Sequence, residues 1–328
     1  VLGGGTGLST LLRGLKDYTS NITAVVTMAD DGGSSGRLRN ELGIPPPGDI
    51  RNTLVALADT EPLMERLFQY RFTDGEGLKG HSFGNLFIAA MCEVTGDFEA
   101  AVKESSKVLA VRGKVLPSTL QEVVLKAEFV DGSEVVGESH IPSRGKKIKR
   151  VMLDPPDAAA LPEAVQAIRE AHAIVLGPGS LFTSIMPNLL VREIADAIKA
   201  SSAPKVYICN VMTQPGETDG FKASDHVKAI IDHAGAGLID FVVVNQAQVP
   251  PQILERYRKE GAHPVSADRE ALEALGLTVV DGDLIDRSDL ARHDPAKLAA
   301  VVMEILSRAH PLSAAGVRSA NGQGRVAR

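Results

Sequence analysis

Short, almost continuously apolar runs recur along the chain, and segments with the periodicity of amphipathic helices separate them. The runs are ITAVVTM at 22–28, AIVLG at 173–177, KVYICNV at 205–211, DFVVVN at 240–245 and LTVV at 277–280. Continuous apolar strands are typical of a parallel sheet that is buried on both faces. The helical segments lie at 8–16, 50–70, 84–94, 98–109, 162–171, 188–200, 224–234 and 252–260. This alternation predicts a doubly wound α/β fold with a mostly parallel sheet.

One stretch departs from this rhythm and predicts an insertion. TLQEVVLKAEFVDGSEVVGESHI alternates apolar and polar residues around Asp131–Gly132, which is a strong β-hairpin signal. We therefore expect one α/β domain over residues 1–310, with an antiparallel hairpin extension at 113–152. Residues 311–328 lack apolar periodicity, and we predict that they form a flexible tail.

Composition and charge exclude several classes of protein. The formal net charge of −6 argues against general binding to nucleic acid or to anionic membranes. The longest apolar runs fall well short of the ~18 residues of a membrane span, and no signal peptide is evident. Cys92 and Cys209 lie in apolar runs and predict buried thiols, which fits a reducing, cytoplasmic location.

A glycine turn near the start of the chain predicts an anion site. VLGGGTGLST runs from an apolar strand through glycines into a helix, so backbone N–H groups can approach an anion. No Lys-Ser/Thr follows at the spacing of a Walker loop, and Leu8 replaces the third glycine of a dinucleotide fingerprint. A tight turn without a ligand stays an alternative. The candidate residues are Gly4, Gly5, Thr6 and Gly7.

Two adjacent carboxylates, Asp30 and Asp31, follow the apolar run at 22–28. In a dinucleotide-binding fold the ribose carboxylate lies about 20 residues after the first turn, so NAD is one candidate ligand. Two carboxylates at a strand end could instead hold Mg²⁺ against a phosphate. Both interpretations remain open from these residues.

Two further motifs place polar residues at helix starts. In GIPPPGDIRN the prolines stiffen a loop, and Asp49 is expected to cap a helix whose first turn carries Arg51 and Asn52. In LKGHSFGNL, His81 and Asn85 stand immediately before an apolar helix. A plain helix start explains either motif. The rigid lead-in of the first motif favours a site beside the same crevice, whereas for His81 a structural role and a site role both stay open.

A second glycine turn repeats the first. IVLGPGSLFTS places Gly177, Gly179 and Ser180 between a buried strand and a helix. Because parallel strands open their carboxyl ends at one edge of a sheet, we expect this turn and the one at 3–7 to converge on a single pyrophosphate.

Polar residues after the later strands could bind a base, ribose or sugar. CNVMTQPGETDG supplies Asn210, Thr213 and Gln214, although a plain connection would look similar. Tyr257 stands on a charged helix and could stack on a base, and Arg292 is a further candidate for base or phosphate contact.

Long motifs in this chain closely resemble the gluconeogenesis factor family (YvcK-type) of the CofD-like superfamily. They are GGGTGLS, ADDGGSSGRLRNELGIPPPGDIRN, GHSFGNL, VRGKVLP, GPGSLFTSI, NLLV and VYICNVMTQPGET. The resemblance covers about residues 1 to 308. It implies a Rossmann-like, cytoplasmic bacterial protein that binds UDP-sugars, UDP-N-acetylglucosamine in particular, and supports cell shape and wall synthesis on gluconeogenic carbon sources.

The same resemblance implies roles for particular residues. The two glycine turns become the diphosphate grip, and Tyr257 and Arg292 the uridine contacts. Kinship with 2-phospho-L-lactate transferase implies an acidic, metal-dependent site near Asp30–Asp31.

Three functions are therefore under consideration. The first is a regulatory protein that binds a UDP-sugar and acts through an unidentified protein partner; the sequence leaves the oligomeric state open, with a homodimer as one alternative. The second is a Mg²⁺-dependent phospho-group transferase. The third is an NAD-dependent oxidoreductase. The sequence leaves open whether any reaction is catalysed.

Overall fold

The computed structural model describes residues 1–59, 62–286 and 291–309. Its centre is a seven-stranded sheet of order β10-β9-β8-β7-β1-β2-β3, and each of its strand pairings is parallel. The strands are β1 (Leu2–Gly3), β2 (Thr23–Val26), β3 (Lys114–Pro117), β7 (Ile174–Leu176), β8 (Lys205–Ile208), β9 (Phe241–Asn245) and β10 (Thr278–Gly282). The predicted α/β fold with a mostly parallel sheet is confirmed.

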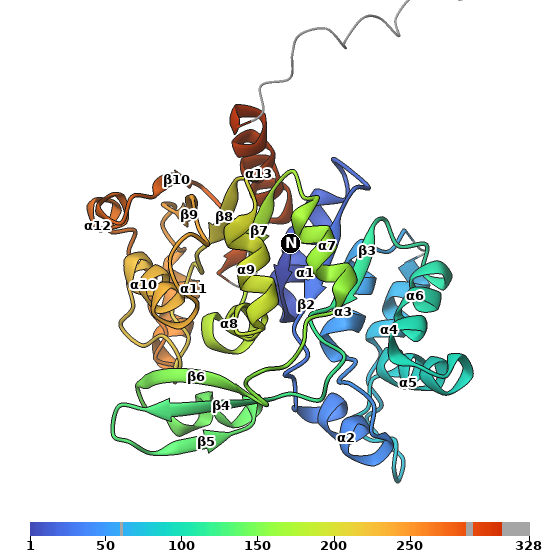
Figure 1. Ribbon diagram of the computed structural model, residues 1–328. Helices are drawn as coiled ribbons and strands as arrows, with labels where there is room; N and C mark the ends of the chain where they lie inside the picture. The colour runs from blue at the N-terminus through green and yellow to red at the C-terminus, as the bar shows by residue number, and fades with distance from the viewer. Residues whose placement is uncertain (60–61, 287–290, 310–328) are drawn as a thin grey trace, which may run out of the picture.

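Helices flank this sheet in two groups (Figure 1). Helix α1 (Gly5–Leu15) packs on α3 (Gly48–Leu57) and α13 (Pro295–Ala309), whereas α9 (Arg192–Ala200) packs on α7 (Pro162–Arg169) and α8 (Met186–Leu189). The strands are buried between these two groups of helices, and for this reason the strand sequences are continuously apolar. The other helices are α2 (Gly33–Leu42), α4 (Pro62–Gln69), α5 (Phe83–Thr95), α6 (Phe98–Val108), α10 (Ala223–Ala234), α11 (Pro251–Lys259) and α12 (Arg269–Ala274).

The predicted single helix over 50–70 is wrong. Helix α3 ends at Leu57, and Ala58 turns to extended backbone, where it forms an isolated β-bridge with Val111. Helix α4 starts anew at Pro62, a residue that fits the first turn of a helix but not its interior.

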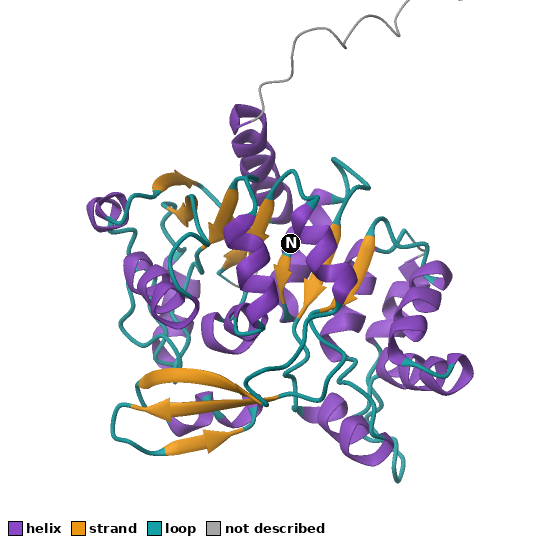
Figure 2. Cartoon of the chain, in the orientation of Figure 1, coloured by secondary structure: helices purple, strands orange, loops and turns teal. Residues whose placement is uncertain are grey.

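The insertion is a separate three-stranded antiparallel sheet of order β5-β4-β6, which lies apart from the central sheet in Figure 2. Its strands are β4 (Val124–Phe129), β5 (Glu134–Val136) and β6 (Ile148–Asp154), and the predicted hairpin joins β4 to β5. The predicted bounds of 113–152 need correction, because residues 114–117 form β3 of the central sheet and β6 continues to Asp154. We call residues 124–154 the extension. It also contains two short 3₁₀ helices, η1 (Glu138–His140) and η2 (Pro142–Arg144).

Strand order defines where a ligand can enter. β1 pairs with β2 on one side and with β7 on the other, so the chain winds outward in opposite directions from the β1–β7 pair. In open α/β sheets the crevice at such a reversal, outside the carboxyl ends of the strands, is the usual ligand site. Both glycine turns follow these two strands.

Three sequence predictions remain to be placed. Cys92 and Cys209 are buried free thiols, as predicted. Among the described residues, no helix is both long and apolar enough to cross a membrane. The predicted flexible tail at 311–328 lies outside the described residues.

Candidate functional site

The two glycine turns lie directly against each other. A Cβ added at Gly7 would stand 2.6 Å from the carbonyl oxygen of Pro178 and 2.9 Å from the backbone nitrogen of Gly179. Gly5 and Gly177 have φ of 63° and 81°, a region that favours glycine. The close approach of the two backbones and their turn geometry therefore require glycine at these positions.

A polar cavity of about 460 Å³ opens where the turns meet, which is a volume typical of small-molecule sites. Its walls come from both turns, from the ends of β2 and β8, and from the extension. The lining residues are Gly4, Gly5, Thr6, Gly7, Thr10, Thr27, Asp30, Asp49, Glu138, Pro178, Gly179, Ser180, Thr183, Ser184, Asn210, Val211, Met212, Thr213, Gln214, Tyr257, Ala291, Arg292 and His293.

Strand order defines two ends of the cavity. β2 ends toward Thr27 and Asp30, the neighbouring strands β1 and β7 end in the two glycine turns, and β8 ends toward Asn210–Gln214. Adjacent strands lie about 4.8 Å apart, so the β2 end and the β8 end are separated by roughly 14 Å. The turns occupy the middle of the cavity, between two chemically different ends.

Hydrogen bonds between side chains order the β8 end. Gln214 Nε2 donates to Ser180 Oγ at 2.7 Å, and Asn210 Nδ2 donates to Gln214 Oε1 at 3.3 Å. Thr213 Oγ1 accepts from the backbone N–H of His263 at 2.9 Å. The loop after β8 is therefore tied to the second glycine turn before any ligand binds.

An apolar cluster separate from the main core supports Tyr257. Val211 and Met212 pack with Ile253 of α11 and Ala291, and Tyr257 lies against them half-buried. The Tyr257 side chain therefore lines the cavity while it packs against this apolar cluster.

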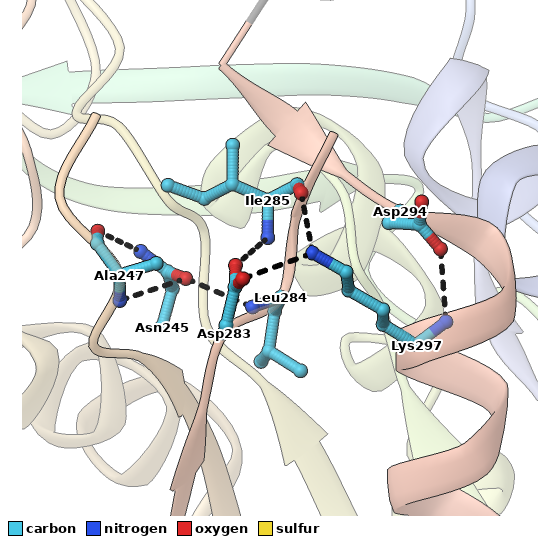
Figure 3. A network of polar contacts seen from close by, with 7 residues as sticks. All are labelled: Asn245, Ala247, Asp283, Leu284, Ile285, Asp294 and Lys297. Atoms are coloured by element: carbon cyan, nitrogen blue, oxygen red, sulfur yellow. Dashed lines mark hydrogen bonds and ion pairs between the residues drawn. The ribbon is translucent and has the colours of Figure 1, made fainter. Parts of the chain in front are cut away.

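A polar network anchors the segment that carries Arg292 (Figure 3). The short antiparallel pair of β11 (Ile285–Asp286) and β12 (Arg292–His293) leads into α13. Lys297 Nζ donates to the carbonyl oxygen of Ile285 at 3.2 Å and forms an ion pair with Asp283 at 3.1 Å. The backbone N–H of Leu284 donates to Asn245 Oδ1 at 3.1 Å. These contacts join the segment to the end of β9 and to α13.

Carboxylates gather at the β2 end. Burial, with the nearby charge of Asp30, raises the pKa of Asp49 to about 7, although the Gly5 N–H donates to it. Burial also raises the pKa of Asp30. Burial, with Asp30 and Asp49 as neighbours, raises the pKa of Glu138 to about 8. The predicted cap at Asp49 needs correction: α3 is preceded by Pro47, and Asp49 lies within its first turn.

A carboxylate of the protein already holds part of the second turn. Thr183 Oγ1 donates to Glu217 Oε1 at 3.2 Å, and the backbone N–H groups of Phe182 and Thr183 also donate to this side chain. Burial raises the pKa of Glu217 to about 7. The amides at the start of the helical turn η3 (Leu181–Ile185) are thus engaged, whereas Pro178, Gly179 and Ser180 precede them and line the cavity.

Six predicted site residues do not line the cavity: Asp31, Arg51, Asn52, His81, Asn85 and Gly177. Arg51 donates to Ser82 Oγ at 2.5 Å and to Asn52 Oδ1 at 2.7 Å, and the backbone N–H of Asn85 donates to the same serine at 3.2 Å. His81 Nδ1 lies 3.0 Å from Ser34 Oγ. Arg51, Asn52, His81 and Asn85 thus belong to a polar cluster that joins α2, α3 and the start of α5. They do not line the cavity, which corrects their predicted place in the crevice.

Asp31 does not line the cavity either. Its Oδ1 accepts from the backbone N–H of Ser139 in the extension at 2.9 Å, so the two adjacent carboxylates make different contacts. Among the described residues, no three His, Cys, Asp or Glu side chains are grouped to hold a metal ion. Asp30 and Asp49 are the carboxylates beside the glycine turns. One or two carboxylates with substrate phosphate oxygens are donors that suit Mg²⁺.

The structure adds lining residues that the sequence analysis did not select: Thr10, Thr27, Glu138, Pro178, Thr183, Ser184, Val211, Met212, Ala291 and His293. The hydroxyls in GSLFTS could have been found from their spacing after the second turn. Glu138 carried no such signal, because it reaches the cavity through the packing of the extension.

A second cavity of about 500 Å³ opens at the amino-terminal ends of the strands. Val1, Leu15, Ile168 and Leu306 are among its mostly apolar walls, together with the Lys114–Glu163 ion pair at 2.9 Å. None of the predicted site residues lines it.

Comparison with known proteins shows that most of this chain is similar to one family of proteins. The family described as 2-phospho-L-lactate transferase CofD matches residues 1–285. The gluconeogenesis factor of Bacillus subtilis is 57% identical over 307 residues, which cover 93% of this chain and 97% of that protein. The gluconeogenesis factor of Halalkalibacterium halodurans is 56% identical over 305 residues, which cover 93% and 95%.

A solved structure agrees with these sequence matches. The crystal structure of a UPF0052 family member from Bacillus halodurans superposes with a TM-score of 0.90 at 55% identity, and it covers 92% of this chain and 97% of that one. The resemblance inferred from the sequence motifs is confirmed.

Proposed function

Because this chain belongs to the CofD family, with the gluconeogenesis factors among its relatives, we propose that its cavity binds a nucleotide sugar of the UDP-N-acetylglucosamine type. The diphosphate would lie on the paired glycine turns, the uridine at the β8 end and the sugar at the β2 end. Binding would regulate a protein partner, in the cytoplasm, without turnover of the ligand.

The observation that carries this proposal is the contact between the two turns. With an added Gly7 Cβ only 2.6 Å from the Pro178 carbonyl oxygen, the backbones of both turns meet at one point of the cavity wall. Two anion-binding backbones that meet suit two linked phosphates better than one. Tyr257 and Arg292 then lie toward one end, where a base can stack and accept hydrogen bonds.

Isothermal titration calorimetry with UDP-N-acetylglucosamine tests the proposal. We expect saturable binding by the native chain and a loss of about tenfold or more in affinity for Tyr257→Ala, since base–aromatic stacking contributes about 1–3 kcal/mol. Tyr18→Ala is the matched control, because Tyr18 is 51% exposed and lies outside the cavity. Failure to bind any UDP-sugar at millimolar concentration would remove the proposal, and stronger binding of NAD would replace it with a dinucleotide ligand.

A transferase is the second candidate, favoured by the carboxylates of Asp30 and Asp49 beside the glycine turns and by the family match. If a Mg²⁺ ion binds, these two side chains would hold it together with phosphate oxygens of the ligand, and it would neutralise charge on a transferred group. Metal-dependent release of UMP, GMP or UDP from a nucleotide substrate would establish this function and contradict the regulatory one.

The cellular role that we propose is support of cell shape and wall synthesis on gluconeogenic carbon sources. A bacterial strain that lacks its own relative, complemented with this chain, should recover normal shape on such carbon sources. The Tyr257→Ala variant should fail to restore shape, and Tyr18→Ala should succeed. We also propose that the chain forms a homodimer, which light scattering would measure.

A further inference from the structure

The extension contributes one residue to the cavity wall, Glu138. The contacts of its two neighbours define its position. The backbone N–H of Ser139 donates to Asp31 Oδ1 at 2.9 Å. Gly137 has φ of 100°, and a Cβ added there would stand 2.3 Å from Asp31 Oδ2. Asp31 therefore binds the backbone that follows Glu138 and packs closely against the backbone that precedes it, while the Glu138 side chain lines the cavity.

Carboxyl groups gather where Glu138 enters, and the Glu138 side chain carries its negative charge above its pKa of about 8. Asp30 and Asp49 line the same end of the cavity, and both act electrostatically on Glu138, as do Asp31 and Glu217. Among the described lining residues, Arg292 is the one with a positively charged side chain. It belongs to the segment that packs with Val211 and Met212 near the end of β8. Among the described residues, no ammonium or guanidinium group lines the β2 end, although the Arg51 guanidinium lies close enough to act electrostatically on Asp30 and Asp49.

This arrangement treats two classes of nucleotide differently. A third phosphate beyond the diphosphate grip would bring like charge against these carboxylates, and such juxtaposition is strongly unfavourable in a partly buried site. The hydroxyl groups of a sugar donate hydrogen bonds, which carboxylate oxygens accept. The β2 end is therefore suited to a neutral polyol.

We propose that Glu138, positioned by Asp31, selects nucleotide diphosphates whose terminal group is a neutral polyol over nucleotides that end in a free phosphate. The inference rests on the proposed nucleotide-sugar function and adds to it the residue that determines the class of terminal group. It also assigns the extension a part in ligand recognition.

Competition between UDP-N-acetylglucosamine and UTP tests the inference. Both ligands are titrated in EDTA at a pH above the Glu138 pKa of about 8, where the side chain is charged. We expect the native chain to prefer the UDP-sugar. In Glu138→Gln the affinity for UTP should rise by about tenfold, because one opposing charge is removed. The affinity for the UDP-sugar should change by only about two- to threefold, because an amide still accepts a hydrogen bond from a hydroxyl.

Two further variants separate selection from general effects. Glu134→Gln removes a carboxylate from an exposed position of the same extension and should leave the preference unchanged. Asp31→Ala should reduce the preference as Glu138→Gln does, and it should add nothing when combined with that substitution. Thermal melting verifies that each variant is folded.

The outcomes distinguish this inference from the function on which it rests. If neither ligand binds the native chain, the nucleotide-sugar function fails and selection fails with it. If the UDP-sugar binds but Glu138→Gln retains the native preference, Glu138 is not the selecting residue and the nucleotide-sugar function stands. If Mg²⁺ makes the native chain prefer UTP and Glu138→Gln abolishes that effect, Glu138 serves as a metal ligand and the inference is overturned.

Discussion

Substitution of Gly7 by alanine tests whether the two glycine turns act as one site. The added Cβ would lie 2.6 Å from the Pro178 carbonyl oxygen, 2.8 Å from the Pro178 carbonyl carbon and 2.9 Å from the Gly179 nitrogen. Ordinary contacts of a Cβ begin near 3.4 Å, so the turns must separate by roughly 0.5–0.8 Å to restore van der Waals distances. Overpacking of this kind costs about 1–3 kcal/mol of stability.

The same displacement should weaken ligand binding more than it weakens folding. Backbone N–H groups that grip linked phosphates must keep their spacing, and a shift approaching 1 Å lengthens those hydrogen bonds beyond their useful range. We expect the dissociation constant for UDP-N-acetylglucosamine to rise by at least tenfold, which corresponds to about 1.4 kcal/mol. Calorimetry measures this change, and chemical denaturation measures the change in stability.

Gly3→Ala provides the matched control in the same turn. Its added Cβ would meet Leu8 Cβ at 3.6 Å and Gly177 Cα at 3.9 Å, which are ordinary contacts. We expect near-native stability and affinity. Native affinity in a folded Gly7→Ala variant would refute the reasoning, because the ligand would then not depend on the spacing of the two turns.

Three further predictions, one of them with a matched control variant, have distinct expected outcomes. The pKa of Glu217 is raised from 4.5 to about 7, so the folded state binds the extra proton and wild-type stability falls as pH rises from about 4.5 through about 7. Glu217→Gln should flatten that decline and raise the melting temperature at alkaline pH; an unchanged pH profile would show that Glu217 is not responsible. Gly216→Ala should lower stability by about 1–3 kcal/mol, because its Cβ would stand 2.1 Å from the Pro142 carbonyl oxygen. Gly220→Ala, equally left-handed but with no atom within 4 Å, measures the backbone strain alone by the same denaturation assay. Lys297→Met should reduce UDP-sugar affinity several-fold by loosening the segment that carries Arg292, with a stability loss of about 1 kcal/mol or less; native affinity would contradict the anchoring role.

Local patterns were sufficient for the centre of the site and for the central sheet except β3, which was predicted to lie in the extension. Apolar runs such as KVYICNV became buried parallel strands, because only a strand covered on both faces needs side chains of one kind throughout. The glycine turns could be predicted because their shape depends on the backbone, and glycine is the residue that permits it. The loop after β8 followed in the same way, since its residues immediately succeed a strand end.

Helix boundaries and side-chain directions were less predictable. The break between α3 and α4 depends on the bridge from Ala58 to Val111, which joins distant parts of the chain. Arg51 and His81 occupy helix starts, as expected, but they turn into a buried cluster with Ser82 and Ser34. A sequence pattern gives the element on which a polar residue lies, whereas its hydrogen-bond partners are supplied by other elements.

The sequence by itself determined the doubly wound sheet, the two backbone turns at its carboxyl edge and the antiparallel hairpin, because each depends on residues adjacent in the chain. Tertiary structure alone decided which carboxylates share the cavity. Asp31 accepts a hydrogen bond from the backbone of Ser139, and Glu138, not Asp31, lines the cavity. These residues are more than 100 positions apart, and their meeting depends on how the extension packs against the loop after β2.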